Sequence, residues 1–336
     1  MGKLSVRAEA TTLRLAQPFR ISGYVFETAD VVTVTIDDGT HRGRGEGAGV
    51  YYLGDDVPHM LAAIEGARSA IEAGPSRDDL RAILPPGGAR NAIDAALWEL
   101  EAARAGVSVA ALAGVGEPRP VRTTFTVSAD DPQAMAAVAR SYVQALAIKM
   151  KLTGELELDI ERVRAIRDAR PEVWLGVDGN QGFEIGELRR LTAALVDQGV
   201  SLLEQPLARG READLEGFQS PVPIAGDESI LSLADVATSP GRFDVINIKL
   251  DKCGGLTEGL LMAAEARRLG LGVMVGTMVC TSLGTAPGFV LGQVADLVDL
   301  DGPTFLANDI GPPVTYRDGM LFAGPEVWGS PEAAFA

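Results

Sequence analysis

The sequence is poor in several residue types, and each shortage excludes a class of protein. The 336 residues include two cysteines and two histidines, too few for a disulfide framework or a histidine-rich zinc site. No stretch of 18 uninterrupted apolar residues occurs, and the first residues lack the apolar core of a signal peptide. We therefore expect a cytoplasmic protein that does not span a membrane.

Basic residues are also scarce: 30 lysines and arginines stand against 46 acids, for a net charge of −16. Such a balance lacks the basic footprint that nucleic acids and anionic membranes require. The hydrophobic share of 46% is enough for a large core. The acidic surplus has two interpretations: a solvated surface that keeps the protein soluble, or a few carboxylates that bind a cation.

The first third of the chain predicts an α+β unit. Residues 4–15 and 31–36 are rich in β-branched residues, whereas residues 57–73 and 91–105 show helical periodicity. Glycine-rich residues 43–49 lack the strand-then-helix setting and the lysine of a phosphate loop. We interpret them as a flexible strand end near a ligand.

After about residue 120, short apolar runs alternate with helix-like segments. This alternation predicts parallel βαβ units, and eight of them make a (β/α)8 barrel. The predicted strands are residues 124–127, 146–151, 173–177, 201–203, 222–225, 245–250, 273–275 and 297–300. The predicted helices are residues 132–146, 157–169, 185–198, 233–237, 255–269 and 283–294.

Charged residues mark the carboxyl ends of these strands, where the active site of a barrel forms. The marker residues lie 22 to 27 residues apart, the length of one βα unit: Lys151, Asp178, Glu204, Asp227, Lys249, Gly276 and Asp299. Nearly all of them are charged, so chance placement of charge at strand ends is a poor explanation. We expect these side chains to meet at one mouth.

Three acids, Asp178, Glu204 and Asp227, end three successive strands and should be neighbours. Three clustered carboxylates cannot all stay ionised without a cation. Oxygen ligands without histidine or cysteine suit a hard ion, so Mg²⁺ is the first candidate and Mn²⁺ the alternative.

Lysines accompany these acids. Lys149 and Lys151 lie two apart on a strand and so point to the same face. A neighbouring like charge and a nearby cation lower the pKa of a lysine, which can then act as a general base. Lys249 ends a strand across the barrel, so a substrate carbanion would be approached from both faces. A simpler interpretation stays open, in which Lys149 and Lys151 only neutralise the acids.

Several short segments, in this order and spacing, resemble the enolase superfamily and, within it, the muconate-lactonizing subgroup. The resemblance rests on Lys149-Met150-Lys151, Asp178-Gly179-Asn180, Glu204-Gln205-Pro206, Gly226-Asp227-Glu228-Ser229, residues 247–255 and residues 86–94. It implies an α/β fold, a modified (β/α)8 (TIM) barrel of the (β/α)7β type with an N-terminal α+β capping domain. The implied domains are residues 1–120 for the cap, 121–305 for the barrel and 306–336 for a segment that packs back toward the cap.

One segment, Asp299-Leu300-Asp301-Gly302-Pro303, resembles the Asp-x-Asp signature of the dipeptide epimerases. Two carboxylates two residues apart on a strand face the same way and suit an ammonium group, here the N-terminus of a dipeptide. Residues 276–282 resemble the seventh-strand loop of these epimerases, in which Thr277 would hold the dipeptide. Cys280 is interpreted as packing rather than as a nucleophile, because no histidine lies close to it in sequence.

The resemblance implies a Mg²⁺-dependent isomerase that inverts the α-carbon of the C-terminal residue of a dipeptide. Lys151 and Lys249 would be the acid/base pair of a 1,1-proton transfer through a metal-stabilised enolate. The further implied roles are electrostatic assistance by Lys149, substrate contact by Thr126, and support of the metal ligands by Asn180 and Glu228.

The cap should select the substrate side chain, because loops at residues 18–26 and 49–55 are expected to close over the mouth. Epimerases that take a C-terminal glutamate carry an arginine in the first of these loops. Gly23 and Tyr24 stand near that position, and Arg20 comes too early. Tyr24 and Phe26 predict an apolar, substrate-contacting wall, so we expect that the preferred second residue is not glutamate.

Other functions fit the same residues. Relatives with these lysines racemise N-acylamino acids or proline derivatives, cycloisomerise muconate or form o-succinylbenzoate, and the Asp299/Asp301 pair argues against an N-acylated substrate. A non-catalytic metal- or metabolite-binding barrel is a third reading, although binding alone needs no opposed lysines. The resemblance to this family also implies that the protein forms a homo-oligomer.

Overall fold

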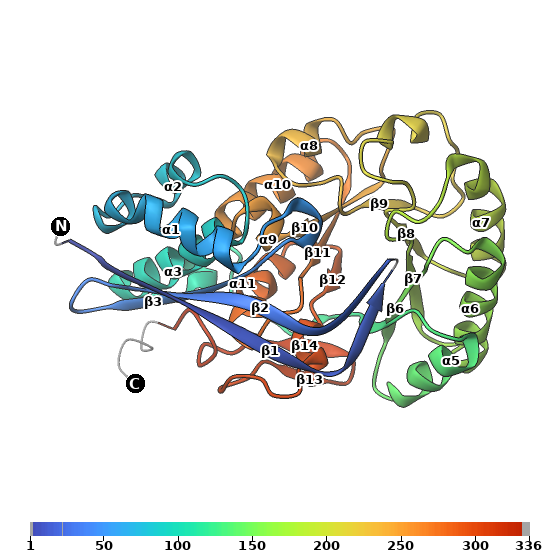
Figure 1. The fold of residues 1–336 in the computed structure, drawn as a ribbon, viewed down its shortest axis with the longest axis horizontal. Helices are drawn as coiled ribbons and strands as arrows, with labels where there is room; N and C mark the ends of the chain where they lie inside the picture. The colour runs from blue at the N-terminus through green and yellow to red at the C-terminus, as the bar shows by residue number, and fades with distance from the viewer. Residues whose placement is uncertain (1–2, 22, 331–336) are drawn as a thin grey trace.

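The structure, a computed structural model, describes residues 3–21 and 23–330 and places a cap beside a barrel along the long axis of the molecule (Figure 1). The cap sheet is antiparallel, in the order β1 (Ser5–Ile21), β2 (Tyr24–Asp37), β3 (Arg42–Ala48). The helical elements of the cap are η1 (Tyr51–Leu53), α1 (Val57–Glu72), α2 (Arg77–Ile83), α3 (Gly88–Ala105) and α4 (Val109–Leu112).

The barrel sheet contains eight parallel strands in sequence order. They are β5 (Phe125–Val127), β6 (Ala147–Lys151), β7 (Trp174–Asp178), β8 (Leu202–Glu204), β9 (Ile224–Gly226), β10 (Val245–Lys249), β11 (Gly272–Gly276) and β12 (Leu297–Asp299). The N–H of Thr124 donates to the carbonyl of Val298 at 3.0 Å, so the first strand meets the last. All eight predicted strands are confirmed, with ends shifted by at most two residues.

Helices and short helical turns connect the strands and cover the barrel. They are α5 (Pro132–Ser141), α6 (Leu156–Ala169), α7 (Ile185–Asp197), η2 (Glu212–Leu215), α8 (Leu233–Ala237), α9 (Leu250–Cys253), α10 (Leu256–Arg268), α11 (Ser282–Gly292) and η3 (Gly302–Phe305). The predicted helix over residues 132–146 is too long, because α5 ends at Ser141. The Arg170 guanidinium binds the carbonyls of Ala139, Tyr142 and Ala145, which holds the following turn out of helical geometry.

Two predictions about the cap change. Residues 43–49 are more than a strand end: residues up to 48 belong to β3, which packs along α3, and the end of this strand lines the cavity described below. A Cβ on Gly45 would lie 2.1 Å from the Ala92 carbonyl oxygen, so the glycine permits this close approach. Residues 18–26 are mostly not a loop but the end of a long β1–β2 hairpin, in which Phe19 pairs with Phe26. A register shift between Arg14 and Phe19 accommodates Pro18 within β1.

The C-terminal part of the chain touches both units. A small antiparallel sheet joins β13 (Thr315–Arg317), β14 (Met320–Phe322) and β4 (Val121–Arg122). Nε1 of Trp328 donates to the Arg44 carbonyl at 2.9 Å, and the N–H of Gly329 donates to Glu99 at 2.9 Å. These contacts attach the end of the described chain to β3 and α3 of the cap.

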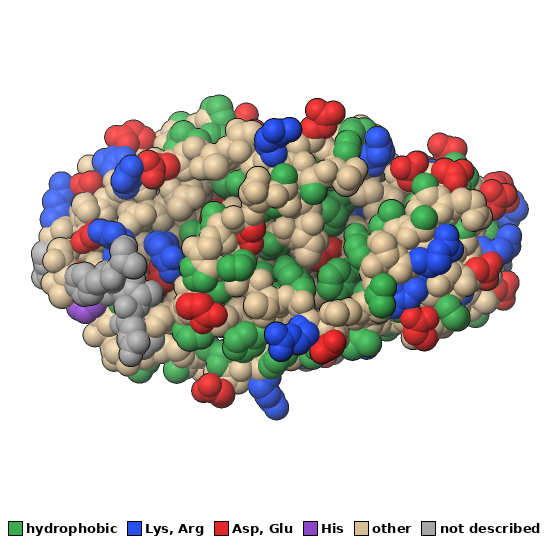
Figure 2. All heavy atoms as spheres, turned by 90° about the horizontal axis from the view of Figure 1, so that it is seen from below, with side chains coloured by type: hydrophobic (Ala, Val, Ile, Leu, Met, Phe, Trp, Pro, Cys, Tyr) green, Lys and Arg blue, Asp and Glu red, His purple; other side chains and the backbone are tan. Residues whose placement is uncertain are grey.

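Acidic and basic side chains are interspersed around the edge of the face in Figure 2, whereas hydrophobic side chains gather near its middle. This face carries no continuous basic surface. None of the described helices is both long and apolar enough to cross a bilayer.

Candidate active site

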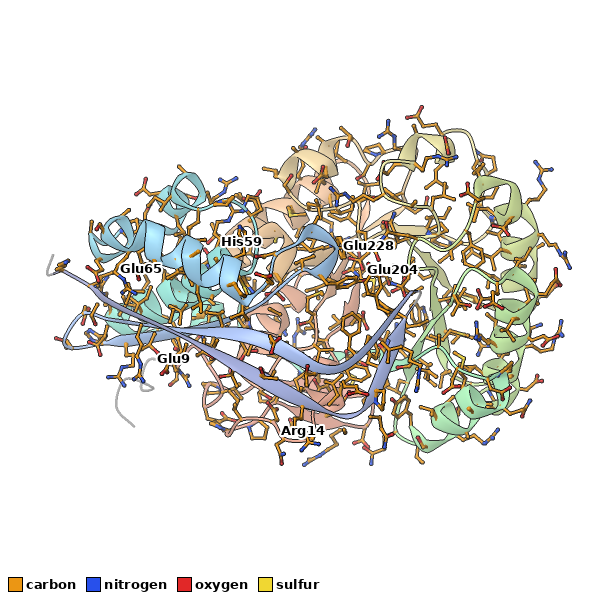
Figure 3. All side chains as sticks on the ribbon, in the orientation of Figure 1. Glu9, Arg14, His59, Glu65, Glu204 and Glu228 are labelled. Atoms are coloured by element: carbon orange, nitrogen blue, oxygen red, sulfur yellow. The ribbon has the colours of Figure 1, made fainter. Side chains whose placement is uncertain are left out.

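A cavity of about 450 Å³ lies between the cap and the carboxyl ends of the barrel strands. Its wall combines β1, β2 and η1 of the cap with the ends of the barrel strands. The predicted site residues that line it are Thr126, Lys149, Lys151, Lys249, Thr277, Asp299 and Asp301. Figure 3 labels Glu204 and Glu228 in this region, where the cap meets the barrel. Together with Asn180 and Glu228, which also line it, the fold brings side chains from seven barrel strands or the turns after them to one cavity.

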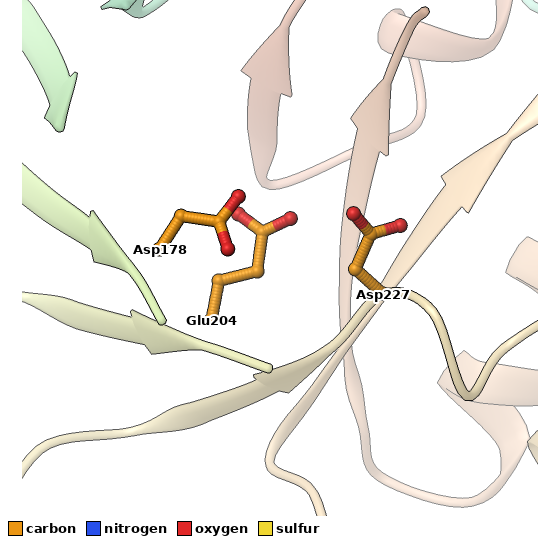
Figure 4. Close-up of side chains that lie close together, drawn as sticks. All are labelled: Asp178, Glu204 and Asp227. Carbon is orange, nitrogen blue, oxygen red and sulfur yellow. The ribbon is translucent and has the colours of Figure 1, made fainter. Parts of the chain in front are cut away.

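The three predicted metal ligands lie together at the barrel mouth. Asp178, Glu204 and Asp227 each offer an oxygen, and these oxygens lie within 4.8 Å of one another (Figure 4). All three side chains are buried. Burial, and next the charge of Asp178, raise the pKa of Glu204 to about 8. The donor set and this electrostatic conflict both fit a hard divalent cation.

The three lysines contact this acidic cluster from two sides. Nζ of Lys151 lies 2.6 Å from Oδ2 of Asp178, and Nζ of Lys249 lies 2.7 Å from Oδ2 of Asp227. β6 and β10, which carry these lysines, are separated by three strands on either side of the eight-strand barrel. Lys151 and Lys249 therefore approach the cluster from opposite sides.

The surrounding acids raise the pKa of two of these lysines, whereas the lowering predicted for Lys149 and Lys151 depends on a bound cation and stays a prediction. Burial lowers the pKa of Lys149, but the charges of Asp299, Glu204 and Asp178 outweigh it and raise the pKa well above its ordinary value. The pKa of Lys249 is also raised, because Asp227 outweighs burial. Repulsion between the lysines is thus smaller than their attraction to the acids. The interpretation that the lysines only neutralise the acids therefore stays open beside the general-base interpretation.

Asp299 and Asp301 both face the cavity, although only Asp299 belongs to β12. Asp299 accepts hydrogen bonds from Nζ of Lys149 and from Oγ1 of Thr124. Oδ2 of Asp301 accepts the N–H of Thr126 at 2.6 Å. Burial, and next the charge of Asp299, raise the pKa of Asp301 to about 7. A cation beside this pair would favour the ionised form of Asp301.

Asn180 and Glu228, which are predicted to support the metal ligands, contact each other. Nδ2 of Asn180 lies 3.4 Å from Oε1 of Glu228, and the Asn180 N–H donates to Oδ1 of Asp178 at 2.9 Å. Both side chains line the cavity, and each has one buried oxygen without a hydrogen-bond partner. A bound ligand or its water can supply the missing donors.

Three residues that contact the predicted metal ligands escaped the sequence prediction. Nδ2 of Asn247 donates to Oε1 of Glu204 at 2.8 Å. Nζ of Lys252 lies 2.5 Å from Oδ1 of Asp227, and Oε1 of Gln205 accepts the Asp227 N–H at 2.9 Å. Asn247 lies two residues before Lys249 on β10, so strand alternation could have placed it at the mouth.

The cap wall is aromatic. Phe19, Phe26 and Tyr51 line the cavity, and the Phe19 ring packs against Phe305 of the barrel, with ring centroids 4.8 Å apart. Tyr24 does not line it: its ring is half-exposed and packs edge-on against Tyr51, with ring centroids 4.6 Å apart. Substrate contact by Tyr24 therefore stays a prediction, and in the structure the Tyr24 ring supports the rings of Tyr51 and Phe26.

Thr277 and Cys280, the two residues considered in the seventh-strand loop, lie in different surroundings. Thr277 lines the cavity, whereas Cys280 is buried beside it, with Sγ 3.1 Å from Oγ1 of Thr277 and 3.3 Å from Oγ1 of Thr285. Burial raises the pKa of the Cys280 thiol far above its ordinary value. A thiol in this state is a poor nucleophile, which agrees with its interpretation as packing.

Comparison with known families accounts for most of the chain. Residues 3–114 match the mandelate racemase / muconate lactonizing enzyme N-terminal domain, and residues 133–326 match the enolase C-terminal domain-like family. The L-Ala-D/L-Glu epimerase of Escherichia coli K12 is 39% identical over 307 residues, which are 91% of this chain and 96% of that protein.

Two solved structures are similar over nearly their whole length. An enolase family member from Agrobacterium tumefaciens with homology to dipeptide epimerases, holding sodium and L-Ala-L-Glu, has a TM-score of 0.92 at 39% identity, covering 97% of this chain and 100% of its own. The dipeptide epimerase of Enterococcus faecalis V583, complexed with Mg and L-Leu-L-Tyr, has a TM-score of 0.89 at 29% identity. The match covers 97% of this chain and 98% of that protein.

Proposed function

Because the chain belongs to the enolase superfamily and to its dipeptide epimerases, which are isomerases, we propose that it inverts the α-carbon of the C-terminal residue of a dipeptide. One observation carries the proposal: Lys151 and Lys249 reach the three-acid cluster from opposite sides of one cavity. Two bases on opposite faces are what removal of a proton from one face and return to the other requires.

In the proposed reaction, Nζ of one lysine accepts the α-proton and Nζ of the other donates a proton to the opposite face. The two lysines exchange these roles when the other epimer is the substrate. Mg²⁺, held by Asp178, Glu204 and Asp227, would supply positive charge that stabilises charge developing on the substrate carboxylate and lowers the pKa of the adjacent lysines. Lys149, buried between Asp299 and Glu204, places a further positive charge beside the reacting end.

Asp299 and Asp301 are proposed to bind the ammonium group of the dipeptide. Both carboxylates line the cavity at the end of β12. Their mutual repulsion, which contributes to the raised pKa of Asp301, would be relieved by a cationic ligand. An N-acylated substrate offers no such charge and would leave a buried acid uncompensated.

The side chain of the second residue is proposed to be apolar rather than anionic. Among the described residues, the cations that line the cavity are the three lysines, and no arginine lines it. Arg20 is exposed on the hairpin and lies 3.8 Å from Asp130, outside the cavity. Phe19, Phe26 and Tyr51 instead offer aromatic surface, on which a leucine or phenylalanine side chain can be buried.

The proposal is tested by incubating the protein with Mg²⁺ in D₂O and following deuterium at the α-carbon of the second residue. The panel contains L-Ala-L-X and L-Ala-D-X with X as Leu, Phe, Tyr, Lys and Glu, together with N-acetyl-L-Phe. We expect exchange and epimer formation with the dipeptides, fastest for X as Leu, Phe or Tyr. Clear preference for Glu would contradict the proposed specificity, and exchange of N-acetyl-L-Phe alone would contradict the proposed substrate class.

A further inference from the structure

The turn that follows Lys249 is held in place by the cap. Lys249 is the last residue of β10, and α9 begins directly after it. Oδ1 of Asp251, in α9, accepts two hydrogen bonds from the cap: from the Ala48 N–H at 2.9 Å and from Nδ2 of Asn91 at 2.8 Å. Asp251 and Asn91 are 5% and 3% exposed, so water competes little for these contacts. The cap thus binds the chain two residues beyond the lysine.

Arg90, which precedes Asn91 in α3, holds the far end of the same turn. Its Nε donates to the Gly254 carbonyl at 3.1 Å and its Nη2 to the Cys253 carbonyl. Gly254 has φ of 82°, and a Cβ there would lie 2.1 Å from Nε of Arg90. Glycine is therefore required both for the turn and for the approach of the guanidinium. The buried charge of Arg90 is balanced by Glu258 at 3.6 Å.

Lys252 joins this turn to the acidic cluster. Its fully buried Nζ lies 2.5 Å from Oδ1 of Asp227, while Nζ of Lys249 lies 2.7 Å from Oδ2 of the same carboxylate. The residues after Lys249 are therefore fixed from two directions, by the cap and by Asp227. A shift of the turn would move the Lys249 ammonium group.

The other lysine is held differently. After Lys151 the chain continues into a turn in which Asp159 of α6 accepts the N–H groups of Thr153 and Gly154, at 3.1 and 2.9 Å. Nη1 of Arg162, also on α6, donates to Oγ1 of Thr153 at 2.6 Å. These contacts lie within the barrel. The two lysines thus receive their positions from different units of the protein.

We propose that Arg90 and Asn91 of the cap are positioning residues for Lys249, and that they leave Lys151 unaffected. The cap then does more than select the side chain, because it sets the geometry of proton transfer on one face of the substrate. This inference rests on the two-lysine reaction proposed above. Since each lysine removes the proton of one epimer, loss of the contact should slow proton abstraction from one epimer only.

The experiment compares Asn91→Leu and Arg90→Lys with unmodified protein, using the fastest L-Ala-L-X and L-Ala-D-X pair of the panel. Total loss of the α-proton, summed over recovered substrate and product, is measured for each epimer in D₂O with Mg²⁺. Lys249→Arg identifies the epimer that Lys249 serves. We expect the rate of α-proton abstraction from that epimer to fall about 10-fold or more in both variants, because a base displaced by a fraction of an ångström reacts more slowly. The rate for the other epimer should change little.

Amide hydrogen exchange of residues 250–255 gives a second readout that needs no substrate, and should become faster in Asn91→Leu and Arg90→Lys. The matched control is Trp98→Phe, which removes a hydrogen bond of 3.0 Å from the same helix to Oγ1 of Thr257 without touching the turn. We expect neither readout to change in the control.

Equal slowing of both epimers in the two variants, or unchanged exchange of residues 250–255, would overturn the positioning role and leave the proposed function standing. No abstraction from either epimer by the unmodified protein would instead remove the proposed function, and the inference with it.

Discussion

The backbone N–H of Thr126 donates a hydrogen bond to Oδ2 of Asp301 at 2.6 Å, which joins the end of β5 to the turn after β12. The contact closes the barrel at its mouth and holds the Asp301 carboxylate toward the cavity. Burial and Asp299 raise the pKa of this carboxyl to about 7, so near neutral pH a cationic ligand can shift it to the ionised form.

We expect Asp301→Asn to lower kcat/KM for dipeptides with a free N-terminus by about 10- to 100-fold, the effect of losing a charge-assisted hydrogen bond. The same dipeptides with an acetylated N-terminus are the control, and any residual turnover of them should change little. Steady-state kinetics on both sets measures the difference. Equal losses for free and acetylated substrates would show that Asp301 maintains the barrel mouth instead of binding ammonium.

Divalent metal should stabilise the protein, because it relieves repulsion among Asp178, Glu204 and Asp227. At Mg²⁺ concentrations about 100-fold above the dissociation constant, the expected gain in free energy of unfolding is about 2.7 kcal/mol. Thermal unfolding with Mg²⁺ and with EDTA, at equal ionic strength, measures it. Glu204→Gln should abolish most of the difference, whereas the exposed Glu216→Gln should keep it. A metal-independent Tm would contradict the proposed site.

The aromatic wall of the cap should control selectivity for the second residue. Phe26→Ala removes a ring that lines the cavity, and we expect kcat/KM for L-Ala-L-Phe to fall about 10- to 100-fold, as for about 1.5 to 3 kcal/mol of lost apolar burial. Val25→Ala, on the neighbouring exposed position of the same strand, is the control and should have little effect. A loss of equal size for L-Ala-L-Ala, which cannot reach the wall, would indicate damage to the cap instead.

A buried acid between cap and barrel should make stability depend on pH. Glu46 of β3 accepts the N–H and Oγ1–H of Thr281, at 2.8 and 2.6 Å, and burial raises its pKa from 4.5 to about 7. Between these values the folded protein binds more protons at Glu46 than the unfolded chain does. The free energy of unfolding should therefore fall as pH rises through this window, by about 3 kcal/mol from this group.

Urea unfolding at pH 5, 6, 7 and 8 measures this dependence. The free energy of unfolding of Glu46→Gln should vary less with pH across this window than that of the unmodified protein. The remaining buried acids contribute equally to both proteins. Parallel curves for the two proteins would contradict the assignment to Glu46.

The alternation of apolar runs with helical periods was sufficient to predict the eight barrel strands, because each βα unit is a local pattern with a regular length. The same spacing placed Asp178, Glu204 and Asp227 at successive strand ends and Lys249 across from Lys151, since a closed parallel sheet makes strand order a spatial order. The same reasoning could have predicted Asn247, because it lies two residues before Lys249 on the same strand. These parts of the site are determined by the sequence alone.

Tertiary structure decided what depends on contacts between distant segments. The position of β3 depends on glycines that allow α3 to approach the backbone of the strand. The β1–β2 hairpin depends on pairing between residues that look like a loop in the sequence, such as Phe19 and Phe26. The raised pKa of Lys149 results from acids on three other strands, whose summed charge no spacing reveals. The contact of Asn91 with Asp251 spans 160 residues, and only folding could show that the cap holds the turn after Lys249.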